Sequence, residues 1–141
     1  MMPPRALVID RSVTVAWYLP ERFSSAARAW QQRLLDGEVR LVVPSLHYWE
    51  LANVLRSYVR RGELRAELAR DIFELHLEAP LEPAEPERAT VLQTALDYDA
   101  TVYDAAFIAL SLALDLPLLT AERSTTPWVT RLGRRVHRLM S

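Results

Sequence analysis

The chain has 141 residues, of which half are apolar and a quarter charged, and its formal net charge is −1. This length and composition suffice for one hydrophobic core, so we expect residues 1–141 to form a single domain. The absence of cysteine excludes disulfides and thiolate chemistry, and the near-neutral charge gives no whole-chain sign of nucleic-acid binding.

Short apolar runs alternate with longer segments of helical periodicity along the chain. This alternation predicts an α/β fold, a three-layer sandwich in which helices flank a mainly parallel central sheet. We expect strands at Ala6–Asp10, Arg40–Val43 and Pro117–Thr120, a short edge strand within Glu78–Pro86, and a closing edge strand at Arg134–Leu139. We expect helices from Ser12 to just before Pro20, and over Ser24–Asp36, Ser45–Arg61, Arg65–Leu77, Glu87–Tyr98 and Tyr103–Leu114.

Two of these helices are expected to form a hairpin around Arg61-Gly62-Glu63. The first carries one apolar stripe, Leu51, Val54, Leu55, Tyr58 and Val59, and the second is expected to bury Leu68, Ile72 and Leu75. The last helix, Tyr103–Leu114, is apolar nearly all round and needs an enclosed position. Its apolar stretch is too short to cross a bilayer, and no signal peptide is evident, so we expect a soluble, cytoplasmic protein.

Four acidic residues lie where an apolar run ends or a helix begins: Asp10, Glu50, Asp104 and Glu122. In an open parallel sheet, the ligand crevice lies beyond the carboxyl ends of the strands, so these side chains are expected to meet there. Carboxylates that lie close together repel one another unless a cation offsets their charge. A hard divalent metal such as Mg²⁺ or Mn²⁺ takes oxygen ligands, so the pattern predicts a metal-dependent phosphodiester hydrolase.

Each acid also has a structural interpretation. Asp10 and Asp104 are suited to capping a helix or to favouring its dipole, whereas Glu50 lies in an apolar phrase and needs a partner or an opening. Asn53, one helical turn after Glu50, is suited to hydrogen-bonding Glu50 or a metal-bound water, and equally to a purely structural bond. The three histidines, His47, His76 and His137, lie on different predicted elements and are assigned no role as ligands or bases.

An aspartyl-phosphate phosphatase and a phospho-receiver domain also carry an acid after the first strand. The phosphatase requires a second Asp two residues later, where this chain has Ser12. Both classes use a Lys, and all 17 basic residues here are Arg, which also fits a GC-rich genome. The five arginines of residues 123–138 form either a phosphate-contacting rim or a solvated basic surface.

The phrases around the acids resemble those of the PIN domain nucleases, and specifically the VapC-type toxins of toxin–antitoxin modules. The resemblance spans nearly the whole chain and rests on four blocks in order: Val8-Ile9-Asp10-Arg11-Ser12, Glu50-Leu51-Ala52-Asn53, Tyr103-Asp104-Ala105-Ala106, and Leu118-Leu119-Thr120-Ala121-Glu122. It implies a Mg²⁺- or Mn²⁺-dependent endoribonuclease, a homodimer, and a cognate antitoxin that covers the site.

The resemblance also implies roles for individual residues. Asp10, Glu50 and Asp104 hold the metal, and the fourth acid is Glu122, where the family usually has Asp. Glu122 is therefore either a longer functional acid or an exposed loop acid, and the second reading implies a non-catalytic PIN-like module that binds RNA or protein. Ser12 and Thr120 are expected to support the site or to cap a helix, with capping favoured for Ser12.

Surface available to an antitoxin is predicted on the hairpin of residues 45–77, together with Trp17, Tyr18, Trp30 and Trp49. An amphipathic partner helix is suited to such a surface, although core packing accounts for the same residues. The sequence does not identify the RNA that is cleaved, the antitoxin, or the number of metal ions.

Overall fold

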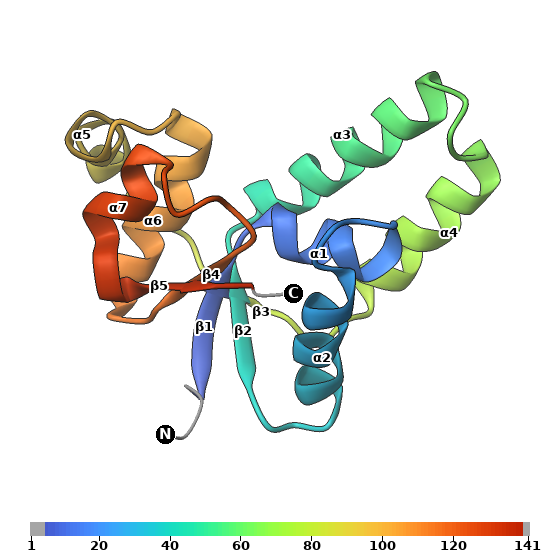
Figure 1. The fold of residues 1–141 in the computed structure, drawn as a ribbon, viewed down its shortest axis with the longest axis horizontal. Helices are drawn as coiled ribbons and strands as arrows, with labels where there is room; N and C mark the ends of the chain where they lie inside the picture. Colours follow the sequence, from blue (N-terminus) through green and yellow to red (C-terminus); the bar gives the residue numbers. More distant parts are fainter. Residues whose placement is uncertain (1–4, 140–141) are drawn as a thin grey trace.

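A computed structural model describes residues 5–139 as a five-stranded sheet with helices on both faces (Figure 1). The strand order is β3-β2-β1-β4-β5, and every pairing is parallel. The predicted α/β sandwich is therefore confirmed, with both predicted edge strands at the edges. The strands are β1 (Ala6–Ile9), β2 (Arg40–Val43), β3 (Glu82–Pro83), β4 (Leu118–Thr120) and β5 (Val136–Arg138).

Helices cover the sheet because its central strands are apolar on both faces. Leu7 and Ile9 of β1 pack in one core cluster with Trp17 and Trp30, while Val8 packs in a second cluster on the opposite face. The first face is covered by α1 (Arg11–Tyr18) and α2 (Ser24–Leu35). The second face is covered by α6 (Val102–Leu114) and α7 (Pro127–Leu132), with α5 (Arg88–Tyr98) packed on α6 (Figure 1). Residues 105–111 of α6 are buried, as its composition predicts.

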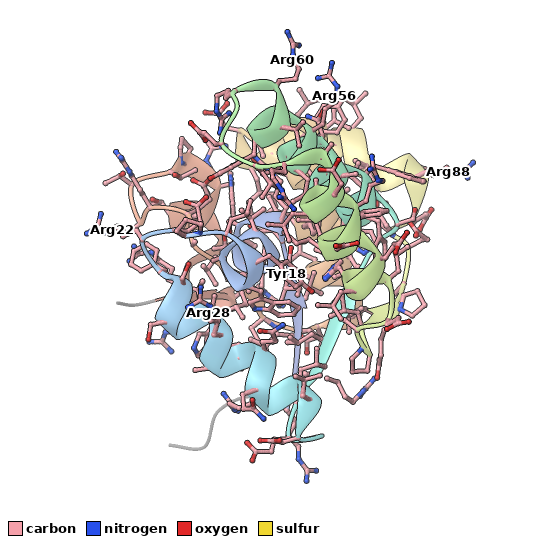
Figure 2. The ribbon with its side chains drawn as sticks, turned by 90° about the vertical axis from the view of Figure 1, so that its right-hand side faces the viewer. Tyr18, Arg22, Arg28, Arg56, Arg60 and Arg88 are labelled. Carbon is pink, nitrogen blue, oxygen red and sulfur yellow. The ribbon has the colours of Figure 1, made fainter. Side chains whose placement is uncertain are left out.

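The predicted hairpin consists of α3 (Leu46–Arg60) and α4 (Ala66–Leu77), and it extends away from the sheet (Figure 1). Figure 2 shows Arg56 and Arg60 pointing outwards near its tip. Gly62 has a φ of 74°, a left-handed conformation that glycine adopts without steric cost and that ends the first helix.

The predicted buried face of α4 is partly wrong. Leu68 and Leu75 are 46% and 60% exposed, whereas a neighbouring stripe faces α3 and the core. That stripe consists of Ala69, Ile72, Phe73 and His76. These residues follow the same spacing of three and four as the predicted set, so periodicity alone did not distinguish the two faces.

The sequence analysis did not identify α7, although Pro127 occupies its first turn, a position that proline favours. The helix ends at a short 3₁₀ turn, Gly133–Arg135, which leads into β5. Within residues 5–139, no helix is both long and apolar enough to cross a membrane.

Candidate metal centre

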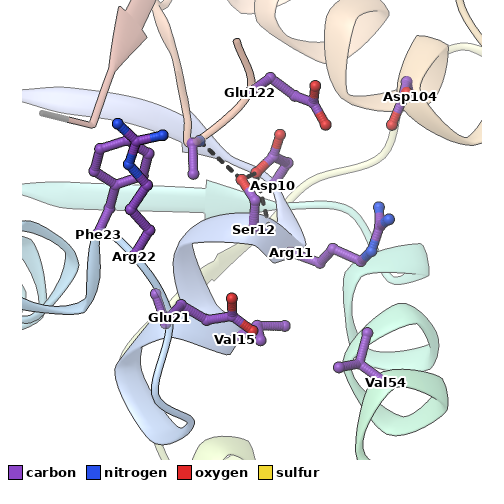
Figure 3. Close-up of a pocket in the computed structure, with 12 residues that line it drawn as sticks. Asp10, Arg11, Ser12, Val15, Glu21, Arg22, Phe23, Val54, Asp104 and Glu122 are labelled. Carbon is purple, nitrogen blue, oxygen red and sulfur yellow. Dashed lines mark hydrogen bonds between the residues drawn. The ribbon is translucent and has the colours of Figure 1, made fainter. Parts of the chain in front are cut away.

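All four predicted acids lie at the carboxyl-terminal edge of the sheet. Asp10 directly follows β1, Glu122 lies just beyond β4, and Glu50 and Asp104 lie near the starts of α3 and α6. Asp10, Asp104 and Glu122 line one cleft of about 350 Å³ (Figure 3), which we call the carboxylate cleft. Glu50 lines an adjoining cleft that shares Arg11 with the first.

Asp10 is the most fixed of the four acids. It is 7% exposed, and its Oδ1 accepts hydrogen bonds from the backbone N–H of Ser12 (3.0 Å) and from the Ser12 hydroxyl. Its Oδ2 accepts from Thr120 Oγ1 at 2.6 Å. Burial raises the pKa of Asp10 to about 6, although the two hydroxyl hydrogen bonds oppose that rise. The carboxylate is therefore held in a single orientation at a cost to its charged form.

The hydroxyls that bind Asp10 are themselves held by the loop after β4. Ser12 Oγ accepts from the N–H of Ala121 (2.9 Å), and Thr120 Oγ1 accepts from the N–H of Glu122 (3.1 Å). Ser12 is not the cap of α1, contrary to the favoured prediction. Asp10 is that cap, because its side chain reaches the Ser12 N–H, and its second oxygen is left for Thr120.

Glu50 pairs with an arginine that the sequence analysis did not single out. Arg11 Nη1 lies 3.4 Å from Glu50 Oε2, while Glu50 Oε1 is buried without a hydrogen-bond partner among the described residues. Burial raises the pKa of Glu50 to about 7, the charge of Arg11 opposes the rise, and the charges of Asp104 and Asp10 add to it. An unpartnered buried carboxylate oxygen is unfavourable, so a water molecule or a cation is expected there.

Asp104 and Glu122 line the carboxylate cleft together with Asp10 (Figure 3). The backbone N–H of Asp104 donates to Thr101 Oγ1 at 3.0 Å, which caps α6. Burial raises the pKa of Asp104, Arg11 opposes the rise, and the charge of Glu122 adds to it. Glu122 is exposed, and its Oε2 accepts from Thr126 Oγ1 at 3.1 Å.

Asn53 lines the cleft that contains Glu50. Within residues 5–139 no hydrogen bond joins the two side chains, so of the roles predicted for Asn53 the direct bond to Glu50 is absent.

The chemistry of the site suits a hard divalent cation. Its negatively charged groups are four carboxylates, whose oxygens are the ligands that such a cation prefers. Asp10, Glu50 and Asp104 have raised pKa values, and one oxygen of Glu50 lacks a partner. Within the described residues, however, no three acids or histidines are close enough to hold an ion as they stand. A cation would therefore have to draw the side chains together, with Oε1 of Glu50 available to it and Oε2 shared with Arg11.

The three histidines lie on different elements, as predicted, but two of them meet in the fold. His47 Nε2 lies 2.8 Å from His76 Nε2, and His76 Nδ1 lies 2.7 Å from the Tyr18 hydroxyl. Burial lowers the pKa of His47 to about 3 and that of His76 to about 4, so both are neutral at pH 7. This chain of hydrogen bonds joins α1, α3 and α4.

Comparison with known proteins identifies a family, a relative and a solved structure that are similar to this chain. The pattern of the PIN domain family matches residues 7–124, a range that includes all four acids. Ribonuclease VapC3 of Pyrobaculum aerophilum is 35% identical over 121 residues, covering 83% of this chain and 89% of that protein. The crystal structure of PAE2754 from Pyrobaculum aerophilum superposes with a TM-score of 0.73 at 20% identity, covering 95% of this chain and 83% of that one, which shows a shared fold.

Proposed function

The chain belongs to the PIN domain family, and we propose on this basis that it is a metal-dependent endoribonuclease, the toxin of a type II toxin–antitoxin pair. The observation that carries the proposal is the 35% identity to a ribonuclease along 83% of this chain and 89% of that protein. We further propose that residues 1–141 act as one domain in the cytoplasm, on an RNA substrate.

Asp10, Glu50 and Asp104 are the proposed metal ligands, and Glu122 is the proposed fourth catalytic acid. Mg²⁺ or Mn²⁺, when bound, supplies positive charge to the phosphate oxygens and makes a water more acidic. Ser12 and Thr120 orient Asp10 through their hydroxyls, and Asn53 supports the wall beside Glu50. A carboxylate of the cleft accepts a proton from the attacking water while the water oxygen bonds to phosphorus; the bond from phosphorus to the leaving ribose oxygen breaks, and that oxygen takes a proton from solvent.

The antitoxin is proposed to dock in a groove between α3 and α4, which we call the hairpin groove. Its volume is about 370 Å³, and apolar side chains such as Leu55 and Phe73 line it together with Arg56 and Arg70. This lining suits an amphipathic helix with acidic flanks. Fewer aromatic side chains are available at the surface than predicted. Trp17, Trp30 and Tyr18 pack in the core, and of the four predicted residues Trp49 alone is exposed. The test is to co-express this chain with the protein encoded by the neighbouring open reading frame. If the two proteins do not co-purify, this partner is contradicted.

A homodimer is also proposed, through exposed apolar side chains on α5 and α6. Leu92, Leu96 and Tyr103 are each more than 60% exposed, an arrangement that is unfavourable in water and that a second copy would cover. Sedimentation of wild type and Leu96→Glu tests this assignment. A wild-type monomer at micromolar concentration would contradict it.

The decisive experiment is cleavage of mixed cellular RNA with and without Mn²⁺, beside Asp104→Asn. We expect wild type to cleave only with metal and the variant to cleave at least about 100-fold more slowly, the scale of losing one preorganised charge in an active site. Equal cleavage by both proteins would reveal contamination. Binding of RNA without cleavage by either protein would favour the non-catalytic module.

A further inference from the structure

Arg11 is the only charged side chain among the described residues that lines both the carboxylate cleft and the cleft containing Glu50. It is the first residue of α1, directly after Asp10. Its side chain is 45% exposed, and its one recorded ion pair, to Glu50, is a single contact of 3.4 Å. Figure 3 shows the guanidinium between the Asp104 wall and α3.

The position of Arg11 is not explained by helix stability. A positive charge in the first turn of a helix opposes the helix dipole, so an Arg there is disfavoured unless other charges hold it. The neighbouring carboxylates supply those charges, because Arg11 interacts favourably with Asp10, Glu50 and Asp104. Arg11 therefore provides positive charge at the point where the proposed metal would provide it.

We propose that Arg11 is a built-in counter-ion of the metal centre, which holds Glu50 in the metal-free protein, yields it to a divalent cation, and then contacts the phosphate backbone of RNA. This inference rests on the proposed function. It makes Arg11 a positioning residue for Glu50 before metal binds and a substrate-binding residue afterwards.

Two features support the exchange. Arg11 contacts only Oε2 of Glu50, while Oε1 has no partner among the described residues. A cation that binds both oxygens therefore makes one more favourable contact with Glu50 than Arg11 makes. The contact is a single one of 3.4 Å, and the Arg11 side chain is 45% exposed, so water can solvate the guanidinium once it separates from Glu50. Once free, it remains on the rim of the cleft, and its planar fork matches the two non-bridging oxygens of a phosphate.

The first test is calorimetric titration of Mn²⁺ alone into wild type, Arg11→Gln and Arg28→Gln. Arg28 is exposed on α2 and lines neither cleft (Figure 2). Its variant is a matched control because each substitution replaces one Arg by Gln and so changes the net charge equally. We expect Arg11→Gln to bind Mn²⁺ about three- to tenfold more tightly, because it loses both the competing ion pair and the repulsion of the ion. Arg28→Gln should match wild type. Thermal unfolding in EDTA checks that all three proteins fold.

The second test is binding of a labelled single-stranded RNA in Ca²⁺ over a range of salt concentrations. For Arg11→Gln we expect weaker binding and a salt slope shallower by about 0.7, the value for one lost phosphate contact on a single strand. Arg11→Lys should retain the slope. Arg28→Gln should again match wild type.

Each outcome decides one part of the inference. Unchanged or weaker Mn²⁺ binding by Arg11→Gln overturns the counter-ion role, and an unchanged salt slope overturns the contact with RNA. If neither wild type nor Arg11→Gln binds Mn²⁺, the metal requirement of the proposed function fails instead, and the counter-ion role fails with it.

Discussion

Replacing Asp10 by Asn should stabilise the metal-free protein at alkaline pH. Asn has the shape of a protonated Asp, and its amide can still hydrogen-bond Ser12 and Thr120. Burial raises the pKa of Asp10 from 3.8 to about 6, so the folded protein binds a proton more tightly than the unfolded chain does. Stability is therefore lost as pH rises from about 4 to about 6, and the loss is complete above that range.

The size of the effect follows from the two pKa values. One pKa unit corresponds to about 1.4 kcal/mol, so the charged Asp10 lowers the free energy of unfolding by about 3 kcal/mol at pH 8 and by about 1 kcal/mol at pH 4.5. We expect Asp10→Asn to recover most of this difference in urea denaturation with EDTA. Mn²⁺ at 100 times its Kd should stabilise wild type by about 2.7 kcal/mol and leave the variant unchanged.

A matched control is Asp71→Asn, which removes the same charge from an exposed position on α4. It should change the free energy of unfolding by less than about 0.5 kcal/mol at either pH. If Asp10→Asn is no more stable than wild type in EDTA at pH 8, the burial of Asp10 does not disfavour its charge. The electrostatic case for a cation at this site would then be lost.

Three further substitutions test other parts of the structure. Thr120→Val removes a hydrogen bond to a charged carboxylate, and should cost about 1.5–3 kcal/mol at pH 8 in urea denaturation and slow RNA cleavage, whereas Thr120→Ser should retain both. Tyr18→Phe should cost about 1–3 kcal/mol by leaving His76 Nδ1 unpaired, and unchanged stability would indicate that water replaces the phenol. Leu75→Ser on the exposed face of α4 should cost less than about 0.5 kcal/mol, against about 2–5 kcal/mol for Leu51→Ala in the core, and similar losses would contradict the observed orientation of α4.

The position of the candidate site was predictable because it depends on order along the chain. In a parallel sheet every strand ends at the same edge, so acids that follow β1 and β4 meet whatever the details of packing. The positions of Asp10 and Glu122 could be predicted from the strand assignment alone, and that of Asp104 from the start of an apolar helix. The clefts at this edge therefore follow from local patterns and one topological rule.

The partners of those acids were less predictable, because they depend on side-chain reach and on helix rotation. Arg11 lies 39 residues from Glu50, and nothing in either local phrase signals the pair. Thr120 reaches Asp10 across 110 residues, although adjacent parallel strands bring the two together. A contact between neighbouring strand ends is thus open to prediction, whereas a contact between two helix starts requires their relative positions.

The buried histidines show the same limit from another direction. His76 lies one turn beyond Ile72 and Phe73 on the face of α4 that packs inwards, whereas the predicted face, Leu68, Ile72 and Leu75, did not include it. Had the helix been rotated correctly, His76 would have been expected in the core, where a neutral imidazole needs a partner. His47, equally buried on α3, provides it at 2.8 Å. The error of helix rotation therefore contributed to missing the histidine pair, because two apolar stripes of equal period compete on α4 and only packing against α3 selects between them.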